Sequence, residues 1–221
     1  VCTGARMLAE LGADLIKTFY THRFGEVTAA CPVPILIHNA PERVGVNVDP
    51  KTYAKLVDHG NIAGTKDGKK ELDHLAKLLH LARGKNFEVF TGKDTTAYPL
   101  MAFGGSGMFS VTANVLPKVM RELTDHSLAG RHEEARAIHY AYYDLFAALR
   151  LETNPMAVKA ALSLLGLPGG PLRPPLGDLS EANREYIKSL LVKFIVYFYN
   201  IRVFLTAWSA PCSPEVNKQK L

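Results

Sequence analysis

Asn61-Ile62-Ala63-Gly64-Thr65-Lys66 is a short apolar run that ends on a lysine. A run of this length between turn residues is typical of a buried strand. A helical pattern precedes it at residues 51–58, where Asp49 can cap the first turn and Pro50 can begin it. Another follows at residues 72–83, with leucines along one face. The stretch therefore predicts a strand between two helices, which is the repeating unit of an α/β protein.

The alternation of strand and helix extends through the first half of the chain. Further strand-like runs cover residues 14–19, 34–38, 87–90 and 107–111. Five strands joined by helices with short connections indicate parallel βαβ units. We expect a partial α/β barrel over residues 1–115, a helical region over 116–191, and an apolar and then disordered tail over 192–221.

Composition excludes several classes of protein. The 221 residues are 48% hydrophobic and 21% charged, which is ordinary for a globular protein. The net charge of +5 is spread along the chain instead of forming the one-signed stripe of a nucleic-acid surface. Three widely spaced cysteines without a metal-binding spacing indicate no metal site and a reduced, cytoplasmic protein. Charged residues interrupt the apolar segment 190–208, so we expect no membrane span.

Reactive groups of parallel α/β proteins gather at the carboxyl ends of the strands. The ends of the predicted strands carry Lys66 and His38, with Arg43 shortly after His38. Burial of a lysine lowers its pKa and leaves more neutral amine, which can attack a ketone to form an imine. Position alone favours a simpler interpretation, in which Lys66 emerges into solvent at the end of its strand.

Three motifs resemble those of one enzyme family. His38-Asn39-Ala40-Pro41-Glu42-Arg43-Val44-Gly45 is similar to the Tyr-Asn-x-Pro-x-Arg-x-Gly segment of the dihydrodipicolinate synthase and N-acetylneuraminate lyase family. Residues 62–67 resemble that family's imine-lysine strand, and the 28-residue step from His38 to Lys66 matches its tyrosine-to-lysine step. Residues 104–114 resemble its eighth-strand motif, in the form most typical of the synthases. The resemblance covers about residues 35–191.

This resemblance implies a (β/α)8 TIM barrel followed by a helical extension. It also implies a lyase without a cofactor, in which Lys66 forms an imine with pyruvate that then condenses with an aldehyde, as in lysine biosynthesis. Arg43 would bind a carboxylate of the second substrate. Gly92 and the backbone near Phe109 would line the pyruvate pocket. His38 stands where the family has a proton-relaying tyrosine, and histidine can also carry protons near neutral pH.

Alternative interpretations stay open at this point. The family resemblance also fits N-acetylneuraminate lyase, a keto-deoxy-sugar aldolase or a 4-hydroxy-2-oxoglutarate aldolase. Residues 12–21 and 31–35 resemble archaeal-type class I fructose-bisphosphate aldolases instead, which implies Lys17 as an alternative imine lysine. Five strands are fewer than the eight of a barrel, so a truncated, non-catalytic fragment is a further hypothesis. Open strand edges tend to pair with other chains, and we expect a homo-oligomer.

Overall fold

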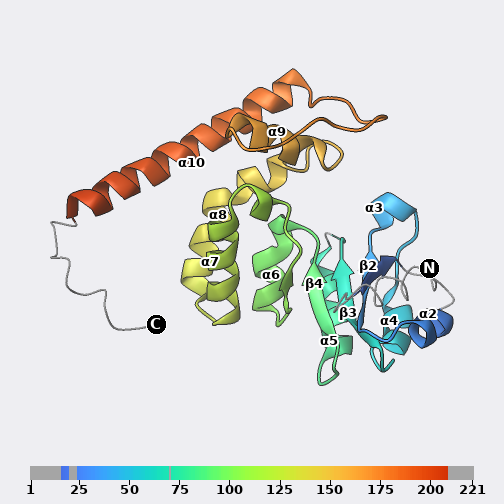
Figure 1. The fold of residues 1–221 in the computed structure, drawn as a ribbon. Coiled ribbons are helices and arrows are strands. Elements are labelled where there is room, and N and C mark those ends of the chain that lie inside the picture. The colour runs from blue at the N-terminus through green and yellow to red at the C-terminus, as the bar shows by residue number, and fades with distance from the viewer. Residues whose placement is uncertain (1–15, 20–23, 70, 209–221) are drawn as a thin grey trace, which may run out of the picture. The chain divides into compact units, whose positions relative to one another are not determined.

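The computed structural model describes residues 16–19, 24–69 and 71–208, and it describes side chains within 25–69 and 71–194 (Figure 1). These residues fall into two compact units, one up to residue 147 and one from residue 148. The predicted disordered tail after residue 208 lies outside the described residues. Each unit is considered by itself below.

The first unit is built on a parallel sheet of five strands. They are β1 (Ile16–Phe19), β2 (Ile35–Asn39), β3 (Ile62–Asp67), β4 (Glu88–Thr91) and β5 (Gly107–Met108). Their order in the sheet is their order in the chain, and every neighbouring pair is parallel. This is the sheet of a TIM-barrel-type α/β fold, with five barrel strands among the described residues.

The fifth strand is shorter than the predicted 107–111. After Met108 the chain turns into the short 3-10 helix η2 (Thr112–Asn114). Asp94 causes this turn, because its buried carboxylate accepts hydrogen bonds from the backbone of Val111 and Thr112 at 3.2 and 2.9 Å. Those backbone groups are therefore unavailable for a strand ladder.

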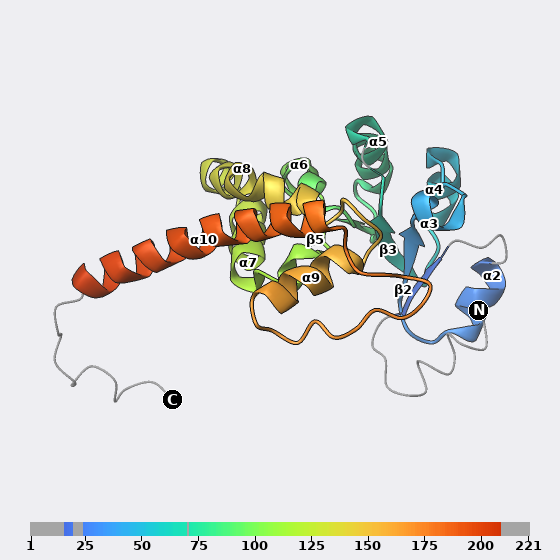
Figure 2. The same cartoon turned by 90° about the horizontal axis from the view of Figure 1, so that it is seen from above.

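Helices cover one side of the sheet, as Figure 2 shows for α4 (Pro50–Leu56), α5 (Leu72–Ala82) and α6 (Ala97–Ala102). The other helices of this unit are α2 (Phe24–Ala30), α3 (Pro41–Val44), η1 (Asp94–Thr96), α7 (Pro117–Leu128) and α8 (His132–Ala148). The predicted start of α4 is confirmed, because the Asp49 side chain accepts a hydrogen bond from Thr52 N at 3.0 Å and Pro50 occupies the first turn. Sheet and helices enclose an apolar core that includes Ile37, Leu75, Leu78, Val89 and Leu100.

The second unit contains α9 (Met156–Leu164) and α10 (Glu181–Trp208), which contact each other. The carboxylate of Glu152 accepts hydrogen bonds from Ser180 N, Ser180 Oγ and Asn183 Nδ2, and so ties down the start of α10. The helix predicted to end near residue 191 continues to Trp208. No helix in the described part of the chain is both long enough and apolar enough to cross a membrane.

Candidate active site

Lys66 lies in β3 at the same level as two aromatic side chains of the adjacent strands. Its register partners are His38 in β2 and Phe90 in β4. Residues opposite each other in a parallel sheet point to the same face, so the sheet brings Lys66 and His38 together. Both side chains are half-buried. The sheet therefore places the predicted site residues Lys66 and His38 side by side.

An aromatic ring stands beside the Lys66 amine. Lys66 Nζ lies 5.4 Å from the centroid of the Phe109 ring, within the range of a cation–π interaction. The Phe90 ring meets the Phe109 ring edge-on at 5.4 Å, and Phe109 N donates a 2.8 Å hydrogen bond to Thr91 O. These contacts hold the ring in place. Its face favours positive charge, as in an ammonium or in the iminium that an imine-forming lysine produces.

Gly92 lies against the side chain of Lys66. Gly92 N donates a 2.7 Å hydrogen bond to Asp67 O, which places the glycine directly beside the end of β3. A Cβ atom at residue 92 would stand 2.8 Å from Lys66 Cε and 3.7 Å from Lys66 Cγ. A side chain at residue 92 would therefore displace the end of the Lys66 side chain from the place that it occupies beside this glycine.

The face of β3 that points away from Lys66 carries a buried polar network that the sequence analysis missed. Asp67, fully buried, accepts hydrogen bonds from Asn39 Nδ2 at 2.8 Å, from Tyr53 OH at 3.1 Å and from Lys69 N at 2.7 Å. His74 Nε2 lies 2.9 Å from the same carboxylate. Strand alternation was a usable signal, because Asn39 and Asp67 directly follow His38 and Lys66 and so point to the opposite face.

Hydrogen bonds within this network keep the Asp67 carboxylate ionised. Burial by itself raises the pKa of the Asp67 carboxyl, but the hydrogen bonds from His74 and Asn39 outweigh burial and leave that pKa lowered. The pKa of Tyr53 is raised well above its ordinary value, because burial and the neighbouring Asp67 carboxylate both oppose a phenolate. Tyr53 therefore remains a hydrogen-bond donor to Asp67 across the working pH range.

Arg43 lies on the exposed one-turn helix α3. The residue before it, Glu42, forms an ion pair with Lys93, whose Nζ lies 2.8 and 2.7 Å from the two carboxylate oxygens. Lys93 is buried and directly follows Gly92. The sequence analysis did not single out Lys93, since a lysine in a loop carries no signal of burial.

Lys17, the alternative imine lysine, lies in β1 opposite Leu36. Phe19 is the β1 residue that pairs with His38, so the Lys17 backbone stands two residues closer to the amino end of the sheet. Its side chain is outside the described residues. The role proposed for Lys17 stays a prediction.

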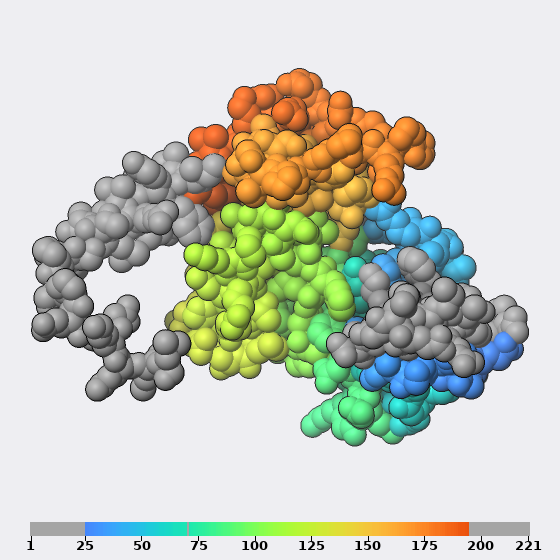
Figure 3. All heavy atoms as spheres, viewed as in Figure 1, coloured from blue at the N-terminus to red at the C-terminus, as the bar shows by residue number. Residues whose placement is uncertain are grey.

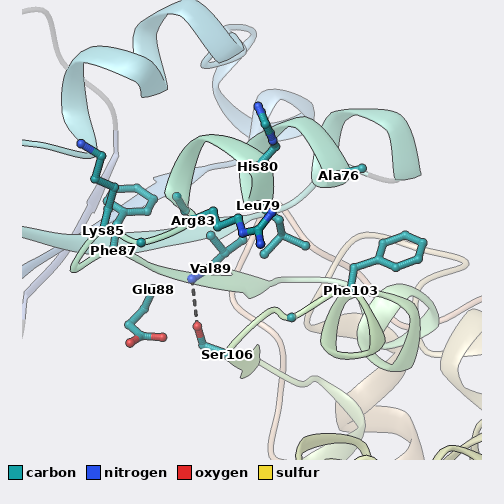
Figure 4. Close-up of a pocket in the computed structure, with 13 residues that line it drawn as sticks. Ala76, Leu79, His80, Arg83, Lys85, Phe87, Glu88, Val89, Phe103 and Ser106 are labelled. Atoms are coloured by element: carbon teal, nitrogen blue, oxygen red, sulfur yellow. Dashed lines mark hydrogen bonds between the residues drawn. The ribbon is translucent and has the colours of Figure 1, made fainter.

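A cavity of about 620 Å³ opens at the other end of the sheet. Figure 4 shows it between the last turns of α5 and the starts of β4 and β5, with Arg83, Phe103 and Ser106 among its lining residues. These are the amino ends of the strands, so the cavity is separate from the Lys66 cluster. Within the described part of the chain, no three His, Cys, Asp or Glu side chains are grouped to bind a metal ion.

Known proteins are similar to this chain in both sequence and fold. The sequence is 35% identical to a 4-hydroxy-tetrahydrodipicolinate synthase from Methanospirillum hungatei, over 86% of this chain and 68% of the relative. It is 40% identical to the protein of that name from Thermoanaerobacter sp. strain X514, over 77% of this chain and 58% of that relative. The chain thus spans about three fifths to two thirds of the length of these curated relatives.

Solved structures agree with the sequence relatives. The 4-hydroxy-tetrahydrodipicolinate synthase from Methylacidiphilum fumariolicum SolV superposes with a TM-score of 0.83 at 30% identity, covering 91% of this chain and 71% of that one. The dihydrodipicolinate synthase from Aquifex aeolicus superposes with a TM-score of 0.80 at 32% identity, covering 87% of this chain and 70% of that one. The pattern of the dihydrodipicolinate synthetase family matches residues 17–194, which is most of the chain, and the chain belongs to that family.

Proposed function

We propose that this protein is a carbon–carbon lyase that binds pyruvate as an imine on Lys66 and condenses it with an aldehyde. The observation that carries the proposal is the placement of Lys66 beside His38, the Phe109 ring and Gly92 at the carboxyl side of the sheet. This set supplies an amine nucleophile, a proton carrier and a face that favours cations. The names of the relatives support the same chemistry.

Each proposed step can be assigned to a group in this cluster. The neutral Lys66 amine attacks the ketone carbon of pyruvate, and loss of water gives the iminium. Loss of a methyl proton to a base gives an enamine, whose terminal carbon attacks the aldehyde carbon. The new carbon–carbon bond leaves an alkoxide that takes up a proton, and water then releases the lysine and an open-chain 2-keto acid. If the aldehyde carries an amine, that amine closes a ring on the keto carbon with loss of water. His38 is the proposed proton carrier, and Phe109 stabilises the iminium charge.

The second substrate follows from the chemical name of the relatives' product. Dipicolinate is a pyridine ring with two carboxylates, which makes seven carbons and one nitrogen. Removing the three carbons of pyruvate leaves a four-carbon aldehyde with an amine and a carboxylate, which is aspartate 4-semialdehyde. A guanidinium binds such a carboxylate in a bidentate manner, and we assign this role to Arg43.

Reductive trapping tests the proposal. The protein is incubated with pyruvate and borohydride, digested, and the modified lysine is read by mass spectrometry. We expect a pyruvate adduct on Lys66 that the Lys66→Met variant lacks. An adduct confined to Lys17 would instead support the fructose-bisphosphate-type interpretation. If neither lysine is modified, the chain is not an imine-forming lyase.

We further propose that the chain acts as a homo-oligomer. Support comes from the sheet, in which β1 and β5 are edge strands among the described residues, and such edges favour pairing with another chain. Light scattering coupled to size exclusion would give the mass in solution. A mass of one chain, 24.3 kDa, would reject this proposal.

A cytoplasmic location is also a proposal. It is supported by Cys31, which is buried with a free thiol. A free thiol suits a reducing compartment. Cell fractionation with an antibody against the chain would test it, and recovery only from an oxidising compartment would contradict it.

A further inference from the structure

Helix α3 carries Arg43 but has little packing of its own. None of its four residues is buried, and Figure 3 shows this part of the chain (light blue) at the molecular surface. Its backbone is closed locally by hydrogen bonds from Arg43 N and Val44 N to Ala40 O. Such a short, exposed turn needs an external contact if it is to hold a side chain in one place.

Glu42 and Lys93 provide that contact. The Lys93 side chain is 6% exposed and its ammonium reaches both oxygens of the Glu42 carboxylate, whereas the Glu42 side chain is 58% exposed. The backbone of Lys93 is itself held by hydrogen bonds. Its backbone N donates to Thr91 Oγ1 at 3.0 Å, and its carbonyl accepts from Thr96 N at 3.1 Å. The pair therefore links α3 to a rigid segment at the carboxyl end of β4.

The two ends of this link stand next to the two substrate-binding positions. Glu42 directly precedes Arg43, and Lys93 directly follows Gly92, which lies against Lys66. The ion pair offsets the charge of Lys93, and Arg43 is the basic residue of α3 itself. The pair spans 51 residues of sequence, so only the fold brings it together.

We infer that the Lys93–Glu42 ion pair positions Arg43 and so sets the affinity for the carboxylate-bearing aldehyde, without taking part in imine formation. This inference rests on the proposed function. Lys93 and Glu42 are positioning residues, which act through Arg43 and do not touch the reacting atoms.

The test uses Lys93→Met, which removes the buried charge and leaves Glu42 facing water. We expect the KM for aspartate 4-semialdehyde to rise about tenfold, since misplacement of a binding group by a mutation can cost up to roughly a hundredfold. The rate of pyruvate trapping on Lys66 should stay within twofold of that of the unmodified protein. Lys93→Arg, which keeps the cation, should restore most of the affinity.

Two controls separate positioning from a general structural effect. In an Arg43→Ala background, Lys93→Met should add no further rise in KM. Lys85→Met removes a more exposed ion pair, Lys85 to Asp58 at 2.6 Å, near the amino ends of the strands, and should change neither quantity. If Lys93→Met does not fold, Glu42→Asp shortens the reach without removing either charge and should raise the same KM.

The outcomes distinguish this inference from the proposed function. An unchanged KM for the aldehyde, or effects of Lys93→Met and Arg43→Ala that multiply, would overturn the inference while leaving the imine chemistry standing. An equal loss of pyruvate trapping would also overturn it. Absence of any pyruvate adduct in the unmodified chain would overturn the proposed function and this inference with it.

Discussion

Asn39 donates a 2.8 Å hydrogen bond from Nδ2 to Asp67 Oδ2, and each of these buried residues directly follows a residue of the candidate site. Asn39 follows His38 and Asp67 follows Lys66. The bond therefore joins the ends of β2 and β3 on one face of the sheet, while lysine and histidine meet on the other. Asn39 Oδ1 also accepts from Val48 N at 3.1 Å, so the chain entering α4 is fixed to the same point.

Asp67→Asn should destabilise the protein by about 3 kcal/mol, the typical cost of breaking a buried charged network. Three donor groups converge on Asp67 Oδ2 and Lys69 N donates to Oδ1, whereas the amide of asparagine has only one accepting oxygen. The measurement is urea unfolding at pH 7. Asp73→Asn is the matched control, because its pair with Lys77 is exposed and should change stability by less than about 0.5 kcal/mol.

The lowered pKa of Asp67 also fixes the pH window of this effect. A carboxyl whose pKa is lower in the folded than in the unfolded state contributes stability above its ordinary pKa and loses it as pH falls through the folded value. The stability gap between the native protein and Asp67→Asn should therefore shrink in strong acid. A gap that widens below pH 4 would contradict this sign.

Gly92→Ala should abolish pyruvate trapping on Lys66 while leaving the fold intact. The added methyl group would stand 2.8 Å from Lys66 Cε, and the flexible end of that side chain can move aside. We expect a rate of trapping at least about a hundredfold lower, because the amine leaves its place. Gly60→Ala, where nothing lies within 4 Å of the new atom, is the control. Normal trapping in Gly92→Ala would show that Lys66 does not act from this position.

His38→Phe should lower the kcat of condensation by about a hundredfold, the lower end of what general acid–base catalysis contributes. Pyruvate trapping should persist, because the Lys66 amine is unchanged. His38→Tyr keeps a group that can carry a proton and should be less impaired. His80→Phe, at the exposed cavity of Figure 4, serves as the control. Equal kcat values for His38→Phe and the native protein would remove His38 from the mechanism.

His139 should make the protein less stable as pH falls below neutrality. Its ring is buried near Tyr98 and Phe146, and burial lowers its pKa. The unfolded state then binds a proton more readily, so stability is full above the ordinary histidine value of about 6.5 and declines below it. His139→Phe should flatten this decline in thermal unfolding between pH 7 and 5. An unchanged slope would assign the acid sensitivity to other groups.

Sequence patterns predicted the strands and most helices because their signals are local. Apolar runs mark the strands, and Asp49-Pro50 marks the start of α4, since capping and backbone geometry act within one turn. The end of α10 was misplaced, because aromatic and β-branched residues after residue 191 still form a helix. The shortening of β5 escaped prediction because Asp94, which causes it, is distant in sequence.

By itself, the sequence determined the parallel α/β fold, the family and the candidate pair of Lys66 and His38. Strand periodicity and the motif spacing are properties of the chain that need no tertiary contact. Only the tertiary structure decided what surrounds that pair. The Phe109 ring, the close approach of Gly92, the Asp67 network and the Lys93–Glu42 ion pair all join separate strands or helices. Burial and contact between residues far apart in the chain arise from packing, and a residue's type and neighbours in sequence do not specify them.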